Sequence, residues 1–251
     1  MSSDNILRFA VLLNELSVQR WQSECIDFLL SDERISLELL ILPQEKQEVS
    51  RKKSWHQRWD KHAMYKLFRK FRLRVQSLEH QSPGWLDKTP IQRCSVEQKG
   101  HSQFFREDDI ERIRSHRLDF ILRFGFNILR GEILQSARFG IWSFHHGDEQ
   151  FYRGGPPGLW EIMHGEAACG AILQRLTTKL DAGIILKKGY FRTSLHSLSE
   201  THDMLLQNTA MWPLQVVRDI LNGISGIDES RPITTDAPIY RFPENGAMNR
   251  F

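Results

Sequence analysis

A short segment in the second half of the chain gathers the residue types that carry acid–base chemistry. It holds Ser143, His145 and His146, a glycine- and proline-rich turn follows at 153–157, and a later turn carries Asp181. Imidazole titrates near neutral pH, so it can take or give a proton, and an aspartate can orient the ring or relay that proton. These residues therefore predict general acid–base catalysis in one pocket.

Ser143 adds a hydrogen-bond donor to this pair. It precedes His145 by two positions, so on an extended strand both side chains point to the same face. Its hydroxyl can donate to a developing oxyanion. The sequence contains no G-x-S-x-G nucleophile elbow, so we expect direct group transfer rather than covalent catalysis.

Other interpretations of the same residues remain open. A His–Asp pair is often structural, and the turn at 153–157 can simply connect a strand to a helix. His145, His146, Asp148 and Asp181 are also metal-compatible ligands. Neighbours on a strand point to opposite faces, however, so His145 and His146 would chelate one ion poorly. We expect no metal here.

The elements that must position these residues alternate between strands and helices. Apolar runs predict strands at 9–13 and 35–42, with a helix over 18–30 between them, which is the start of a parallel sheet. The later pattern predicts strands at 118–124, 139–144, 169–176 and 183–192, and helices at 108–116, 128–136, 156–164 and 199–222, the last kinked at Pro213. Gly125, His145 and the Asp181 turn would then lie at strand ends, where open α/β sheets bind ligands.

Residues 45–80 interrupt this rhythm. They hold eleven Lys/Arg and four Asp/Glu in a chain of net charge +3. Apolar residues recur every four positions at Trp55, Trp59, Ala63, Leu67, Phe71 and Val75, joined by Met64 and Phe68. This spacing predicts an amphipathic helix whose aromatic stripe packs on its own domain. Contact with RNA, an anionic membrane surface or a partner is the alternative.

Composition limits the remaining possibilities. The 251 residues, with 40% hydrophobic content, suit one large globular domain. No apolar run approaches the roughly 20 residues of a membrane span, and no signal peptide is recognisable, so we expect a cytoplasmic protein. Three widely spaced cysteines predict buried free thiols. No G-x-G-x-x-G follows the first strand, which argues against a dinucleotide cofactor. Residues 81–104 predict a connection with one short strand, and 224–251 an extended tail.

Taken in order, these motifs resemble the formyltransferase family, which includes methionyl-tRNA formyltransferase, glycinamide ribonucleotide formyltransferase and the sugar N-formyltransferases. The family motif is Asn-x-His at a strand end, then Arg-Gly and a proline, a glycine in the next strand, and Leu-Asp-x-Gly. The matching residues here are His145, Arg153-Gly154 with Pro157, Gly170, and 180–183. Residues 119–125 and Ile128-Leu129 resemble the family strand and loop whose backbone lines the folate pocket.

The resemblance implies an α/β, Rossmann-like formyltransferase fold with a mixed, mostly parallel sheet flanked by helices. The catalytic domain would span 1–223 with the helical insertion 45–80, followed by an extension at 224–251. The resemblance further implies 10-formyltetrahydrofolate as formyl donor and a small-molecule amine or amino sugar as acceptor. Nucleic acid is not expected as a partner. Peripheral membrane contact through 51–75 and a homodimer are both compatible with the sequence.

Residue roles follow from the same resemblance. The expected catalytic residues are His145, Asp181 and Ser143. The expected folate contacts are Phe124, Gly125, Phe126, Ile128 and Asp181, and the expected substrate contacts are His146, Asp148, Arg153 and Gly154.

One departure bears on activity. Ser143 stands where the family has asparagine, and losing an oxyanion donor costs on the order of 10²–10³ in rate. His146 could supply the missing donor. The alternatives to transfer are a hydrolase that releases formate, a non-catalytic ligand-binding relative, and an RNA- or membrane-surface protein that acts through the basic helix.

Overall fold

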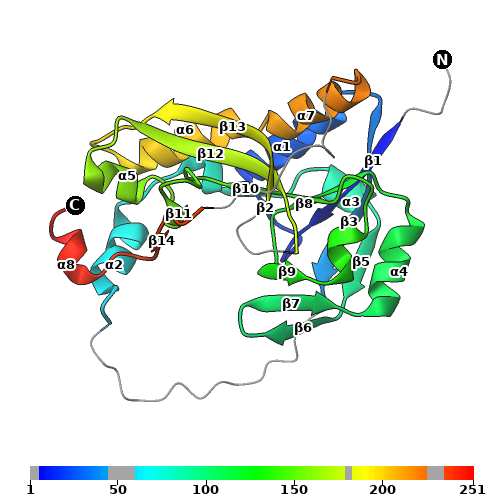
Figure 1. Ribbon diagram of the computed structural model, residues 1–251, viewed down its shortest axis with the longest axis horizontal. Coiled ribbons are helices and arrows are strands. Elements are labelled where there is room, and N and C mark those ends of the chain that lie inside the picture. The colour runs from blue at the N-terminus through cyan, green and yellow to red at the C-terminus, as the bar shows by residue number, and fades with distance from the viewer. Residues whose placement is uncertain (1–5, 45–59, 179–182, 225–234) are drawn as a thin grey trace.

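A computed structural model describes residues 6–44, 60–178, 183–224 and 235–251 (Figure 1). Its centre is a seven-stranded sheet in the order β13-β12-β10-β8-β1-β3-β5. The strands are β1 (Leu7–Leu12), β3 (Ile35–Pro43), β5 (Ile91–Cys94), β8 (Phe120–Arg123), β10 (Ile141–His145), β12 (Ala168–Arg175) and β13 (Ile184–Arg192). The first five strands pair in parallel, whereas β12 is antiparallel to both of its neighbours. The predicted α/β class with a mostly parallel sheet is confirmed.

Helices cover both faces of this sheet (Figure 1). One face packs against α1 (Arg20–Leu30), α6 (Leu198–Thr209) and α7 (Trp212–Leu221). The other packs against α4 (Glu107–Ser115) and the 3₁₀ turn η3 (Glu132–Gln135). Central strands buried on both faces read as continuous apolar runs. This explains why the sequence predicted β1, β3 and β8.

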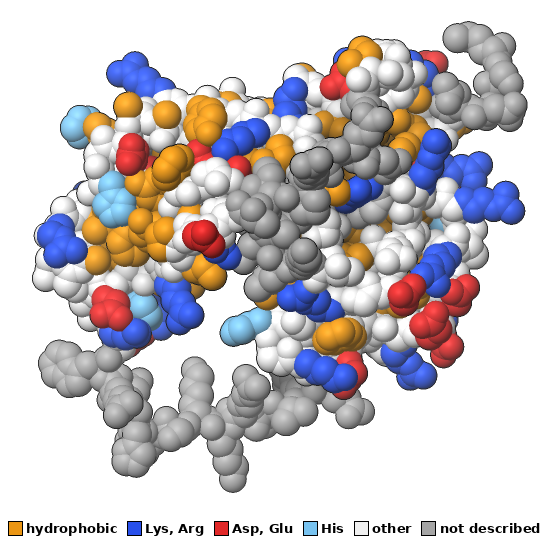
Figure 2. All heavy atoms as spheres, viewed as in Figure 1, with side chains coloured by type: hydrophobic (Ala, Val, Ile, Leu, Met, Phe, Trp, Pro, Cys, Tyr) orange, Lys and Arg blue, Asp and Glu red, His pale blue; other side chains and the backbone are white. Residues whose placement is uncertain are grey.

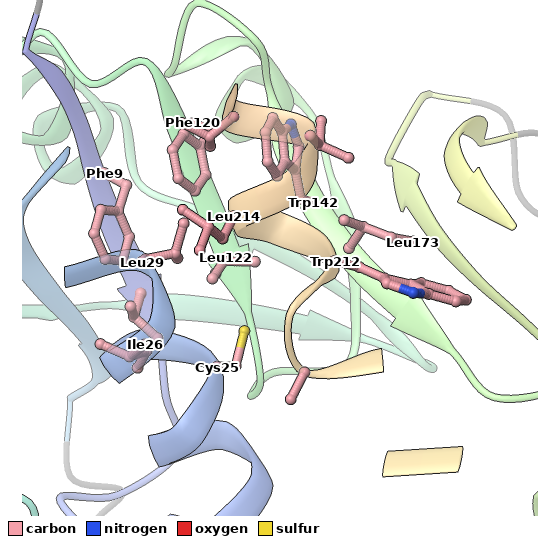
Figure 3. Packing of buried hydrophobic residues seen from close by; sticks show 14 of the residues in the cluster. Phe9, Cys25, Ile26, Leu29, Phe120, Leu122, Trp142, Leu173, Trp212 and Leu214 are labelled. Carbon is pink, nitrogen blue, oxygen red and sulfur yellow. The ribbon is translucent and has the colours of Figure 1, made fainter. Parts of the chain in front are cut away.

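The first face contains an aromatic stack that crosses three strands (Figure 3). Phe9 of β1 stacks on Phe120 of β8 at 5.2 Å between ring centroids, and Phe120 stacks on Trp142 of β10 at 4.2 Å. All three side chains are fully buried. Because side chains alternate along a strand, this stack determines which residues of β8 and β10 face the opposite side.

Two helical predictions were wrong in detail. The helix predicted over 199–222 is two helices, since α6 ends at Thr209 and α7 begins at Trp212 with Pro213 in its first turn. Proline is tolerated there because the first-turn N–H groups have no partner within the helix. The helix predicted over 128–136 is instead strand β9 (Ile128–Arg130) followed by η3.

The predicted single strand in 81–104 was also wrong. This stretch and the residues after it form the short helix α3 (Trp85–Lys88), β5, β6 (Val96–Lys99) and β7 (Ser102–Phe105). β6, β7 and β9 make a separate three-stranded sheet. β6 is mostly exposed, so its sequence lacks the apolar alternation that identifies a half-buried strand.

The basic insertion was predicted to pack its four-residue aromatic repeat on its own domain, and this was wrong for Leu67 and Phe71. Residues 45–59, with Trp55 and Trp59, lie outside the described part. The helix α2 (Ala63–Phe71) leaves Leu67 and Phe71 more than half exposed. Its buried residue is Tyr65, which clusters with Met248, Leu159 and Leu198. The helix packs through Tyr65 and Phe68, whereas Leu67 and Phe71 face outward.

The C-terminal segment is part of the folded structure. β14 (Ile239–Tyr240) pairs with β11 (Arg153–Gly154), and α8 (Asn245–Met248) packs on α2. Phe242 stacks on Tyr65, and hydrophobic side chains gather on the surface at this end of the molecule (Figure 2). Gly154 has φ +88°, and a Cβ there would lie 2.2 Å from the carbonyl oxygen of Tyr240. Glycine is therefore required for this pairing.

The remaining elements are short. They are β2 (Val18–Gln19), the 3₁₀ turn η2 (Gln76–Leu78), β4 (His80–Gln81) and α5 (Leu159–His164). Among the described residues, no helix combines the length and the apolar character that crossing a membrane requires. The three cysteines are buried free thiols.

Candidate active site

Two adjoining cavities open at the carboxyl ends of β8 and β10, with volumes of about 210 and 410 Å³. Both are lined by Arg123, Ile128, His145, Gln174 and Gly183. We call this shared hollow the cleft. It lies at the strand ends where the sequence analysis placed a ligand site.

A larger surface hollow of about 580 Å³ lies at the opposite ends of the same strands, near Leu118 and Gly140. It contains several arginines but none of the predicted acid–base residues. The chemistry therefore concentrates in the cleft.

His145 is the last residue of β10 and half-buried in the cleft. Its Nε2 lies 3.1 Å from the carbonyl oxygen of Tyr152. A ring nitrogen that donates to a carbonyl carries the proton, which leaves Nδ1 as the basic nitrogen of the neutral ring. Asp181, its predicted partner, lies outside the described residues, so their pairing stays a prediction.

Ser143 is buried beside the cleft and lies in register with residues of both neighbouring strands. It is opposite Arg123 on β8 and opposite Gln174 on β12. Arg123 Nη1 donates to Ser143 Oγ at 2.9 Å, and Arg123 Nη2 donates to the carbonyls of Phe126 and Asn127 at 2.9 and 3.0 Å. Burial lowers the pKa of the Arg123 guanidinium.

Sequence reasoning missed Arg123 and Gln174. Both had a usable signal, because a charged or amide residue ends an otherwise apolar run in Phe120–Arg123 and in 169–174. Side-chain alternation would have placed both on the Ser143 face.

His146 does not reach the cleft. Its Nε2 lies 3.0 Å from Thr209 Oγ of α6, and its ring stacks on Phe144 and meets the edge of Trp21. Although part of its surface remains accessible, burial, with the nearby His145 and His202, lowers the pKa of His146 to about 3. The predicted substrate contact by His146 is therefore not supported by its position.

Asp148 lies two residues after His146 and lines neither of the two cavities that form the cleft. Its Oδ1 accepts from Lys188 Nζ at 2.9 Å and from the backbone of Gln150 at 3.0 Å. Burial alone would raise the pKa of Asp148, but these hydrogen bonds outweigh burial and hold it below its usual value. The side chain is thus a buried, paired carboxylate, and its role here is to hold Lys188 and the turn.

Gly170 explains why this turn fits. A Cβ at Gly170 would lie 2.8 Å from Asp148 Cβ, a separation that real Cβ atoms do not adopt.

Among the described residues, no three His, Cys, Asp or Glu side chains are grouped to hold a metal ion.

Arg153 and Gly154 sit at the rim and line the larger cavity. Arg153 Nη1 donates to the carbonyl of Ala237 at 3.0 Å, and Thr235 of the same C-terminal segment lines the cavity too. The tail therefore forms part of the cleft wall.

The predicted folate contacts divide into two groups. Ile128 lines both cavities. Phe124 packs on Trp21 and Phe144 in the core, and the Phe126 ring lies against Phe105. Gly125 allows the chain to pass the end of β1, since a Cβ there would lie 2.6 Å from the backbone nitrogen of Asn14. Gly125 thus shapes the loop, while neither aromatic ring lines the cleft.

The fold and this strand-end cleft define a Rossmann-like α/β protein that carries a histidine at the end of a central strand. No family model matches the chain. Its sequence is 30% identical over 118 residues to a methionyl-tRNA formyltransferase from Clostridium beijerinckii, a match that spans 46% of this chain and 38% of the relative.

Solved structures extend the likeness to nearly the whole chain. Glycinamide ribonucleotide transformylase 1 from Symbiobacterium toebii has a TM-score of 0.58 at 13% identity and covers 92% of this chain and 96% of its own. An N-formyltransferase from Helicobacter canadensis, in complex with folinic acid and dTDP-3-aminofucose, has a TM-score of 0.54 at 10% identity and covers 94% and 70%. The chain thus has the fold of these formyltransferases, and about half of its sequence is similar to a methionyl-tRNA formyltransferase of which it spans 38% of the length.

Proposed function

We propose that the protein is an N-formyltransferase that moves a formyl group from 10-formyltetrahydrofolate to the amine of a small molecule or sugar. The observation that carries this proposal is His145 at the end of β10, facing a strand-end cleft within the family's order of motifs. The H. canadensis enzyme, whose structure was solved with a folate and an amino sugar, supports the choice of donor and acceptor class.

The cleft suits a folate-type donor. The larger cavity has the size of pockets that hold small ligands. Its lining combines apolar side chains, Ile128, Ile172 and Ile185, with the polar Gln174 and Arg153. Such a lining can bury an aromatic ring system and hydrogen-bond its polar edge.

The side chains then have separate tasks. The bound donor supplies the formyl group, and the acceptor amine forms a C–N bond to the formyl carbon while the bond from that carbon to the donor nitrogen breaks. His145 accepts the proton that the amine loses and returns one to the departing nitrogen. Ser143 donates to the formyl oxygen, and Asp181 orients His145. Holding both reactants together supplies much of the rate.

The direct test is a transfer assay with the purified chain, 10-formyltetrahydrofolate and a panel of amino sugars and amino-acid derivatives. Formylated product should appear in the mass spectrum together with tetrahydrofolate, and Asp181→Asn should reduce its rate. Binding of the folate without product from any amine would favour the non-catalytic relative.

Hydrolysis is separated by the same assay without amine. Stoichiometric formate release at the full rate would identify a deformylase, since water then replaces the amine. Folate that does not bind at all would contradict both activities.

A second candidate function rests on α2. Met64, Leu67 and Phe71 are exposed on a helix that also carries Lys66 and Lys70, a composition suited to an anionic membrane surface. Co-sedimentation with vesicles containing an anionic lipid tests it. Binding should fall in Leu67→Glu and Phe71→Glu and weaken with salt, and equal binding by these variants would exclude contact through α2.

A further inference from the structure

A row of three polar side chains crosses the floor of the cleft. The strand registers place Arg123, Ser143 and Gln174 directly opposite one another on β8, β10 and β12. All three line the smaller cavity. On the other face of the same strands their neighbours belong to the aromatic core, so the polar row is confined to the cleft side.

Arg123 brings a positive charge into this row, and no acidic side chain among the described residues pairs with it. Within the described residues it has hydrogen bonds only to Ser143 and to two backbone carbonyls, and its Nε is buried with no partner. The carboxylate that lines the cleft, Glu149, has its Oε1 held by Lys188 at 3.0 Å. A buried charge that is not paired is costly to fold, which points to a role other than stability.

Ser143 lies between the Arg123 guanidinium and the cleft, so the positive charge polarises its hydroxyl. Its Oγ accepts from Arg123, so its own proton remains to be donated, and within the described residues that proton has only a long 3.4 Å bond to the Phe144 carbonyl. A hydroxyl that accepts from a cation becomes a stronger donor, because hydrogen bonds polarise one another along a chain. Gln174 adds a side-chain amide with no hydrogen-bond partner among the described residues.

We propose that Arg123, Ser143 and Gln174 form a site for one anionic oxygen, with Ser143 and Gln174 in contact and Arg123 acting through Ser143. This assignment rests on the proposed function. The anionic oxygen is the oxygen of the transferred formyl group, which becomes an oxyanion when the amine adds to the formyl carbon. The row thus does with a cation-supported hydroxyl what the family does with an asparagine. Arg123 is a positioning residue, and Ser143 is the catalytic donor.

A purely structural role for Arg123 predicts a different experimental result. The guanidinium also holds the Phe126 and Asn127 carbonyls, and Phe126 has φ +65°. If Arg123 only fixed this turn, its replacement would lower the melting temperature and leave anion affinity unchanged in the protein that remains folded.

The experiment measures binding of ¹³C-labelled formate, a small anion with the geometry of the formyl group, by NMR titration of the whole chain. Saturable binding is expected in the wild type. Affinity should fall at least tenfold in Arg123→Gln and in Ser143→Ala, and Arg123→Lys, which keeps the charge, should retain part of it. Arg138→Gln removes a charge outside the cleft and is the matched control, with unchanged affinity.

Ser143→Ala leaves the carbonyl bonds of Arg123 intact, so it tests the site even if Arg123→Gln does not fold. Equal formate affinity in the wild type and Ser143→Ala, or no saturable binding in the wild type, overturns the proposal. Formate binding that depends on the row without formyl transfer to any amine would uphold the anion site while rejecting the proposed function.

In the transfer assay, Arg123→Gln and Ser143→Ala should lower kcat by on the order of 10²–10³ with little change in KM for the folate, because the oxyanion forms only once the amine adds to the formyl carbon. A change confined to KM would mean that the row binds a ground-state group and would overturn the oxyanion assignment.

Discussion

His145 and His146 are neighbours in the chain and occupy opposite environments. His145 faces the cleft between β8, β10 and β12, whereas His146 is wedged among Trp21, Phe144 and Thr209 on the helical face. The first keeps a half-exposed ring beside charged groups. The second is held neutral at physiological pH by a pKa lowered to about 3.

The difference teaches that strand alternation, rather than residue type, decides which histidine can do chemistry. Along β10 the core side receives Trp142 and Phe144, and the cleft side receives Ser143 and His145. His146 continues the core series. A general base needs a pKa near working pH and access to substrate, and only the cleft side offers access.

The largest effect on activity is expected for His145→Gln. Loss of the general base should lower formyl transfer by about 10²–10⁴-fold, with little change in melting temperature because the ring lies at the cleft surface. Initial rates and thermal unfolding check it. A variant that transfers formyl groups at the wild-type rate would remove His145 from the mechanism.

His146→Phe should change stability rather than activity, and the change in stability should appear at acidic pH. The folded pKa of about 3 lies below the ordinary value of 6.5, so the unfolded chain binds a proton that the folded chain refuses. The stabilising contribution of the neutral ring is therefore present above pH 6.5 and is lost as pH falls toward 3, by at most about 5 kcal/mol and less where water reaches the ring.

The phenylalanine ring fills the stacked position without titrating. Urea unfolding at several pH values should show the variant gaining on the wild type as pH falls, while activity at neutral pH is unchanged. A constant difference across pH would show that His146 titrates normally.

Glu161 is a second buried titratable side chain, and its pKa shift has the opposite effect on the pH dependence of stability. It is 2% exposed, its Oε1 has no hydrogen-bond partner among the described residues, and burial raises its pKa to about 7. The folded chain then holds a proton that the unfolded chain releases, so its stabilising contribution is present below pH 4.5 and is lost as pH rises to 7, by about 3 kcal/mol.

Glu161→Gln should therefore be more stable than the wild type at pH 8 and similar at pH 4. Glu33→Gln, a change at an exposed glutamate on another part of the chain, serves as the control and should shift neither value. Equal pH profiles for the wild type and Glu161→Gln would show an ordinary Glu161.

The smallest expected effect is on the free energy of unfolding, and it tests how tightly Gly170 packs against the turn at Asp148. Gly170→Ala places a Cβ 2.8 Å from that of Asp148, and the resulting shift should cost roughly 1–3 kcal/mol. Gly84→Ala is matched, since nothing lies within 4 Å of a Cβ there, and should be close to neutral. Denaturant unfolding of both proteins measures the difference, and equal midpoints would show that the Asp148 turn gives way freely.

The sequence was enough to predict β1, β3 and β8, because these strands are continuous apolar runs, and to place His145 at a strand end. It did not locate β5, where Gln92 and Arg93 interrupt the apolar pattern. It could not place His146, since the end of β10 cannot be fixed to one residue by apolar pattern. The row of Arg123 and Gln174 depends on the register between strands that are far apart in the chain. Polar strands such as β6 carry no apolar signal, and the exposed repeat of α2 follows from where Tyr65 docks.

The pairing of β14 with β11 has a consequence for the order in which the protein is built. All seven strands of the central sheet precede residue 193 in the chain, whereas Thr235 and the partner strand of Arg153–Gly154 come after residue 234. During synthesis from the N-terminus, the sheet can therefore assemble before the cleft has its last wall. A nascent chain passes through a stage that is folded at its centre and still open at its ligand site.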